Sequence, residues 1–281
     1  MNSKHTQTGQ LAQEQALRQA VAALQSGRPQ EAEWLAADVL KASPTEPRAL
    51  QVFGYALLQQ GKAKEAIAPL KSAARRARDP EIETQLAMAY QQAGNDDDAI
   101  DQLERAISRS PPFPPAFLVY GSLLTFLDQR DKALEIVKRG LAIAPNFPDL
   151  LSLLGDNLMM RGDAAGGRNA YNEALKYAPT HGDALFGLAR ALQNDGDFAG
   201  AAALFKRILT VQPSDNAARI GLGVCLLELG DSEAGYHELR HAAQRDAQAY
   251  AEVVNAVSMA RTGRFWLRAS QARRFLSDKN T

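Results

Sequence analysis

Residues 80–113 read PEIETQLAMAYQQAGNDDDAIDQLERAISRSPPF, and this stretch predicts how the whole chain folds. Pro80 suits the first turn of a helix, where its missing N–H breaks no hydrogen bond. Apolar side chains then recur at helical spacing around the small Ala87, and Gly94 ends this helix. Capping and acidic residues follow, after which a second apolar stripe continues at helical spacing. We therefore expect an antiparallel helical hairpin over this stretch.

The same pattern returns along the chain at a period of 34 residues, with one step of 33 between Gly54 and Ala87. The small residues that mark it are Ala20, Gly54, Ala87, Gly121, Gly155, Ala189 and Gly223. A second ladder follows seven residues after the first and consists of Gly27, Gly61, Gly94, Asp128, Gly162, Gly196 and Gly230. A constant period of this length is typical of a repeat array. Because one hairpin cannot bury its wide apolar stripe alone, we expect the hairpins to stack and cover one another.

A third set of small residues lies near the start of each second helix, where a larger side chain would push two helices apart. Its members are Ala32, Ala66, Ala99, Ala133, Gly167, Ala201 and Gly235. In this spacing the chain resembles the tetratricopeptide repeat (TPR) family, which has small residues at the eighth and twentieth positions of each repeat. The resemblance covers residues 13–249. It implies an all-α fold, a right-handed α-solenoid (superhelix) of stacked antiparallel helical hairpins.

The repeat frame also predicts the domain organisation. It divides the chain into seven tetratricopeptide repeats at residues 13–46, 47–79, 80–113, 114–147, 148–181, 182–215 and 216–249. Residues 1–10 are expected to form a flexible N-terminal arm. Residues 250–281 lose the register and are expected to form C-terminal capping helices, beginning with a helix that carries Val253, Val254 and Val257.

Composition narrows the classes of partner. Lys plus Arg and Asp plus Glu both total 32, so the formal net charge is zero and gives no global attraction to nucleic acid or to an anionic membrane. The polar stretch MNSKHTQTGQ has no apolar core of a signal sequence, and no apolar run is long enough to span a membrane. We expect a cytoplasmic protein without nucleic-acid partners or membrane insertion. The single cysteine, Cys225, excludes an intramolecular disulfide and is expected to be a packed thiol.

One segment matches an enzyme motif. His237-Glu238-Leu239-Arg240-His241 has the HExxH spacing of zinc proteases, in which two histidines bind the metal and the glutamate is the base. In the repeat frame, however, His241 falls in a row of mostly charged, solvated positions, and Leu239 points into the core. A zinc hydrolase built on His237, Glu238 and His241 is therefore the third alternative, and we expect no metal, no cofactor and no catalytic residue.

The resemblance implies a binding surface on the concave face, formed by the first helix of each repeat at its second, fifth, ninth, twelfth and thirteenth positions. The central repeats place there Tyr55, Met88, Phe126, Met159, Met160, Phe186 and Arg190. Methionines among aromatic side chains suit an apolar peptide or helix. Acidic residues at the same positions, such as Asp156 and Asp183, disfavour a strongly anionic ligand. The alternative is that these apolar residues only pack between repeats.

The C-terminal segment holds the densest basic cluster in the sequence, consisting of Arg261, Arg264, Arg268, Arg273 and Arg274. It has two interpretations: the polar face of a capping helix, or a docking surface for an anionic group.

The predicted function is that of a non-enzymatic scaffold or adaptor for protein–protein interaction. It would bind a peptide or helical segment of a partner, apolar and not strongly anionic, in the concave groove. The runner-up is a targeting or regulatory TPR subunit that acts in trans on an enzyme such as a sulfotransferase or glycosyltransferase. The pattern predicts no particular oligomeric state.

Overall fold

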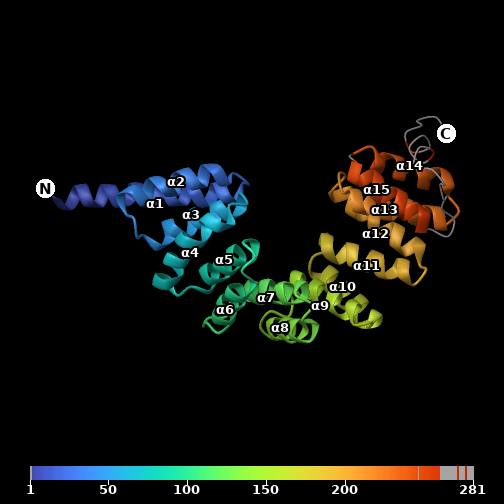
Figure 1. The fold of residues 1–281 in the computed structure, drawn as a ribbon, viewed down its shortest axis with the longest axis horizontal. Helices are drawn as coiled ribbons and strands as arrows, with labels where there is room; N and C mark the ends of the chain where they lie inside the picture. The colour runs from blue at the N-terminus through green and yellow to red at the C-terminus, as the bar shows by residue number, and fades with distance from the viewer. Residues whose placement is uncertain (1, 246, 260–270, 272–275, 277–281) are drawn as a thin grey trace. The chain divides into compact units, whose positions relative to one another are not determined.

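A computed structural model describes residues 2–245, 247–259, 271 and 276, and in this part of the chain all regular structure is α-helical. The predicted all-α fold is confirmed. The helices fall into two compact units, Met1–Ala144 and Pro145–Thr281 (Figure 1). Each unit has its own arrangement of stacked hairpins.

The first unit contains eight helices among the described residues. They are α1 (Asn2–Gln25), α2 (Pro29–Ala42), α3 (Pro47–Gln59), α4 (Ala63–Ala77), α5 (Pro80–Gln92), α6 (Asp96–Ile107), α7 (Pro114–Phe126) and α8 (Arg130–Ile143). The described residues of the second unit contain α9 (Pro148–Met160), α10 (Ala164–Tyr177), α11 (Gly182–Asn194), α12 (Phe198–Val211), α13 (Asn216–Glu228), α14 (Ser232–Ala243) and α15 (Ala247–Met259).

Within each unit, consecutive helices pack against one another as hairpins. The first helices of successive hairpins also touch, as α3 does with α5 and α11 with α13. Each hairpin therefore has neighbours along the stack that cover its apolar stripe, as expected for a repeat array.

The turn inside each hairpin uses a left-handed residue. Gly27, Gly61, Gly94, Gly162, Gly196 and Gly230 all have positive φ, between 68° and 87°. Asp128 stands at the same place in the fourth hairpin and adopts φ 57°. The second sequence ladder is thus a ladder of turns that end the first helix of each hairpin.

The glycines Gly54, Gly155 and Gly223 of the first ladder lie at close contacts inside their hairpins. A Cβ added at Gly54 would lie 2.6 Å from Leu70 Cγ on the partner helix, and one added at Gly223 would lie 2.6 Å from Leu239 Cγ. At Gly155 the obstacle is the ring of Tyr171, 2.5 Å away. A larger residue at any of these positions would have to displace the facing side chain.

The two ends of the chain were predicted as an arm and a cap. Helix α1 begins at Asn2, so residues 2–10 continue the first helix, and the flexibility of this arm stays a prediction. In the C-terminal segment α15 ends at Met259, and it packs against α13 and α14. The five clustered arginines, Arg261 to Arg274, lie outside the described residues.

Candidate binding site

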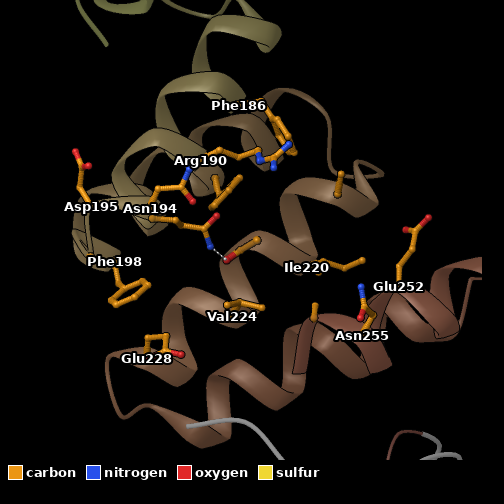
Figure 2. A pocket seen from close by; sticks show the side chains of 16 residues that line it. Phe186, Arg190, Asn194, Asp195, Phe198, Ile220, Val224, Glu228, Glu252 and Asn255 are labelled. Carbon is orange, nitrogen blue, oxygen red and sulfur yellow. Dashed lines mark hydrogen bonds between the residues drawn. The ribbon is translucent and has the colours of Figure 1, made fainter. Parts of the chain in front are cut away.

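The second unit contains a cavity of about 740 Å³ between α11, α13 and α15, which we call the second-unit cavity (Figure 2). Its apolar lining includes Phe186, Phe198, Phe205, Ile220 and Val224. Its polar and charged lining includes Arg190, Gln193, Asn194, Asp195, Glu228, Glu252 and Asn255.

The repeat frame explains why these side chains meet. Phe186 and Ile220 occupy the fifth position of successive first helices, and Arg190 and Val224 occupy the ninth. Residues three or four apart on a helix share one face, so these positions line one side of α11 and one side of α13. Because α11 and α13 pack against each other, the two faces form a continuous wall.

An aromatic pair forms the inner part of the cavity. The rings of Phe186 on α11 and Phe205 on α12 meet edge to face, with centroids 5.7 Å apart and planes at 71°. Gly221 on α13 makes room for the Phe205 ring, because a Cβ at that position would overlap it. Edge-to-face pairs are a favoured aromatic geometry, so this part of the cavity is held in place without a ligand.

Gln193 bridges α11 and α13 at the cavity wall. Its Nε2 donates to the carbonyl oxygen of Gly221 at 3.4 Å and to Cys225 Sγ at 3.2 Å. Cys225 has no exposed surface, and this burial raises the pKa of its thiol to about 11. The prediction of a packed thiol is confirmed, and Gln193 is a positioning residue of the wall.

The charges at the cavity differ in how they are paired. Asp195 forms an ion pair with Arg168, and Glu252 accepts a hydrogen bond from Gln248 at 3.0 Å. Arg190 is exposed, and within the described part of the chain its side chain makes no hydrogen bond or ion pair. The cavity therefore presents one available guanidinium beside an apolar wall.

A hydrogen-bonded pair lies within electrostatic range of Arg190. The hydroxyl of Tyr171 donates to Asp156 Oδ1 at 2.6 Å. Burial raises the pKa of Tyr171, and the hydrogen bond to Asp156 raises it further. The pKa of Asp156 is also raised, chiefly by burial and further by the charge of Asp183, against the opposing effects of Tyr171 and Arg190. The phenol stays protonated at neutral pH and keeps donating to Asp156.

The seven residues predicted for the groove are not all in one place. Phe186 and Arg190 line the second-unit cavity, whereas Met159 and Met160 of the same unit do not. Met159 packs inside its own hairpin, because a Cβ at Gly167 would lie 2.7 Å from Met159 Cγ. Met160 is 42% exposed.

Tyr55, Met88 and Phe126 belong to the first unit, where each can be described by itself. Tyr55 and Met88 are partly buried, and Phe126 is 75% exposed. A role of these three side chains in binding stays a prediction.

The HExxH segment lies on α14 with both histidines exposed and Leu239 fully buried. Glu238 accepts a hydrogen bond from Arg219 Nη1 at 2.8 Å, so the residue that would be the base already has a cationic partner. Among the described residues, no three His, Cys, Asp or Glu side chains are grouped as a metal site requires. The geometry places the two histidines where the repeat frame predicted, and the described residues offer zinc no third ligand there.

Sequence reasoning missed the contribution of α15. Glu252 and Asn255 line the cavity from this helix, although both residues lie beyond the seven-repeat register, which ends at residue 249. The sequence did contain a signal for this contribution, namely the apolar row Val253, Val254 and Val257. If this row faces the core, the neighbouring residues of the same helix lie off its apolar face and can line a surface.

One more property concerns membranes. Of the helices that the structure describes, none is long and apolar enough to cross a bilayer.

Comparison with known proteins identifies relatives by family and by fold. The family model described as Tetratricopeptide repeat protein 21 N-terminal ARM repeat matches residues 24–234. No significant match was found among curated proteins. Among solved structures, TTC0263, a thermophilic TPR protein of Thermus thermophilus, is 27% identical, with a TM-score of 0.57. That match covers 65% of this chain and 100% of the Thermus protein.

Two other solved structures share the fold at lower identity. Human IFIT1, in a dimer with m7Gppp-AAAA, is 17% identical with a TM-score of 0.69, and the match covers 87% of this chain and 62% of IFIT1. A chain of the APC/C hetero-tetramer Cut9–Hcn1 is 17% identical with a TM-score of 0.69, covering 85% of this chain and 48% of that one. This chain thus spans less than two thirds of either protein, and the likeness is one of helical-repeat fold.

Proposed function

This chain belongs to the tetratricopeptide repeat family, and we propose that it is a non-enzymatic interaction module, a scaffold or adaptor that binds a segment of a partner protein in the second-unit cavity. The fold generally mediates contacts between proteins, as in the Cut9–Hcn1 assembly. The observation that carries the proposal is the cavity itself, because it is lined by the fifth and ninth positions of α11 and α13.

The apolar wall supports a peptide as ligand. Phe186, Phe205 and Gly221 hold each other in place, so the wall exists before the ligand arrives. A preformed surface loses little conformational entropy on binding, and the ordering cost falls mainly on the peptide. An apolar side chain of the partner would contact Ile220 and Val224 on this wall.

The charges define the partner further. Arg190 can donate hydrogen bonds to one carboxylate of the partner. A second carboxylate of the partner would be repelled by the negative charges at the same cavity, which belong to Asp195, Glu228 and Glu252. The proposed ligand is therefore a short segment with an apolar anchor and at most one acidic group near it. The same carboxylates disfavour a phosphodiester chain, so we do not extend the RNA ligand of IFIT1 to this protein.

Affinity capture with matched variants tests this function. The double change Arg190→Ala with Ile220→Ala removes the guanidinium and part of the wall, and we expect recovery of protein partners to fall about tenfold or more. The control is Tyr177→Ala, which removes a large exposed side chain that does not line the cavity. Both variants should keep the far-ultraviolet circular dichroism of the parent.

A defined readout follows from the captured partner. Its binding segment, located by cross-linking to the cavity, is made as a synthetic peptide and titrated against the parent and both variants. Equal affinity of the parent and the double variant for this peptide would contradict the proposal. An equal loss with Tyr177→Ala would show that the effect is not local to the cavity.

A further inference from the structure

The first unit contains a second cavity, of about 350 Å³, at α4, α5 and α6, which we call the first-unit cavity. Helix α5 packs against both α4 and α6 (Figure 1). It contributes Leu86 and Tyr90 to the lining, while the flanking helices contribute mostly charged side chains. The predicted groove residues of this unit, Tyr55, Met88 and Phe126, do not line it.

Four cations converge on this cavity from two sides. Lys71, Arg75 and Arg78 come from α4 and its C-cap, and Arg105 comes from α6. All four are exposed, and among the residues that the structure describes none of their side chains has a hydrogen bond or ion pair. Cations near the end of α4 are favoured by the helix dipole. The same effect favours Arg105, which lies in the last turn of α6, so the C-terminal ends of two helices bring cations to one cavity.

The fifth cation at the cavity, Arg109, already has an ion-pair partner, Glu83. Arg109 Nη2 lies 2.5 Å from Glu83 Oε1, and its Nε lies 3.1 Å from Glu83 Oε2. The hydrogen bonds to Glu83 raise the pKa of Arg109, and the ion pair leaves this guanidinium already engaged. The charges that remain in the described lining are the four cations and two carboxylates, Asp98 and Asp101. The first-unit cavity is thus net basic, whereas the second-unit cavity is not: its lining has Arg190 with Glu228 and Glu252, and with Asp195, which is paired with Arg168.

We propose that the first-unit cavity binds a single phosphate monoester carried by a peptide segment of a protein partner. Guanidinium groups bind phosphate oxygens in a two-point geometry, and three of the four unpaired cations are arginines. A phosphoserine brings a charge of about −1.5 to −2 at neutral pH, which compensates the excess of two positive charges. A carboxylate carries a single negative charge and would compensate only half of this excess.

The small volume of the cavity, about 350 Å³, and its two aspartates argue against an extended polyanion. A membrane surface or an RNA chain would bring further negative charges against Asp98 and Asp101, whereas one phosphate can lie among the cations alone. The site is independent of the second-unit cavity, since it uses other residues, another unit and a ligand group of different chemistry.

The test uses the full chain and a neutral glycine–serine peptide with one central phosphoserine. In a nitrogen-15 NMR titration, we expect shifts concentrated on α4, α5 and α6 and on the arginine Nε–H signals of Arg75, Arg78 and Arg105. The double variant Arg75→Gln with Arg105→Gln should weaken binding about tenfold or more, as loss of two charge-assisted hydrogen-bonding groups implies.

The matched control is Arg76→Gln. Arg76 is the next residue on α4, but its Nη1 binds Ser72 Oγ at 2.6 Å and it does not line the cavity. It should leave affinity within about twofold. An equal loss with Arg76→Gln would overturn the proposal in favour of unspecific charge attraction.

The probe also separates the ligand classes. The unphosphorylated peptide should not bind, and a peptide with glutamate in place of phosphoserine should bind more weakly. Tighter binding of the glutamate peptide would overturn the phosphate assignment. A second result would also overturn it. In that result the phosphopeptide does not bind, whereas phosphatidylserine vesicles or single-stranded RNA bind the parent and not the Arg75→Gln, Arg105→Gln double variant. These outcomes do not depend on Arg190 and Ile220. A failure of the phosphate proposal can therefore be distinguished from a failure of the proposed function at the second-unit cavity.

Discussion

At the scale of single residues, the turn glycines act through their backbone, because a left-handed φ costs an L-residue energy that glycine avoids. Gly162 adopts φ 84°, and a Cβ added there would meet no atom within 4 Å. Its role is conformational and not steric. Asp128 adopts the same conformation in the fourth hairpin, as a short polar side chain can.

Gly162→Ala should therefore lower the free energy of unfolding by about 1 kcal/mol without any clash. The control is Gly182→Ala in the first turn of α11, where φ is not positive and the added Cβ also meets nothing within 4 Å. Urea denaturation followed by circular dichroism measures both. An equal loss at both glycines would contradict the conformational explanation.

At the scale of elements, one ion pair ties α5 to the segment after α6. Glu83 is only 4% exposed and sits on α5, while Arg109 follows the end of α6. A buried carboxylate is tolerated because the guanidinium compensates its charge at two points. The pair therefore holds these two elements in a fixed arrangement beside the first-unit cavity.

Arg109→Ala should cost about 3 kcal/mol of stability, because it leaves the buried Glu83 charge uncompensated. Adding Glu83→Gln to that variant should restore part of the loss, since the amide carries no charge. The comparison is Arg18→Ala, which breaks an exposed pair with Glu14 and should change stability by about 0.5 kcal/mol or less. Thermal denaturation of the four proteins would contradict this account if the two single variants lost the same amount.

At the scale of the whole molecule, stability in a stacked array comes from contacts between neighbouring hairpins. Each of the two compact units has apolar clusters of its own, such as Ala20, Ala36 and Ala56 in the first unit. Leu227, Leu239 and Val257 belong to one in the second. Damage to one hairpin should therefore spread to its neighbours and fade along the chain.

Gly54→Val tests this in the first unit, since the new side chain must displace Leu70. Hydrogen exchange of the backbone amides in α3 and α4 should accelerate about tenfold or more, while α13 and α14 stay near their parent rates. Uniform acceleration through both units would instead indicate that the chain unfolds as one cooperative body.

The sequence by itself determined the helical hairpins and their turns. These depend on short-range physics: the φ of Gly94, the missing Cβ of Gly54 and the apolar spacing along each helix all act within one helix or between the two helices of one hairpin. The same frame also put Phe186 and Arg190 on one face of their helix and His241 on an exposed row, because position within a repeat decides which way a side chain faces.

Only the tertiary structure decided which side chains from different helices meet. Glu252 and Asn255 join the second-unit cavity from beyond the repeat register, and Met159, expected in the groove, packs inside its hairpin against Gly167. Arg75 and Arg105 belong to different hairpins, and nothing in the spacing between them indicates a shared cavity. The physical reason is that a repeat pattern specifies the face of each residue, whereas a site depends on how those faces approach across hairpins and on which charges find partners there.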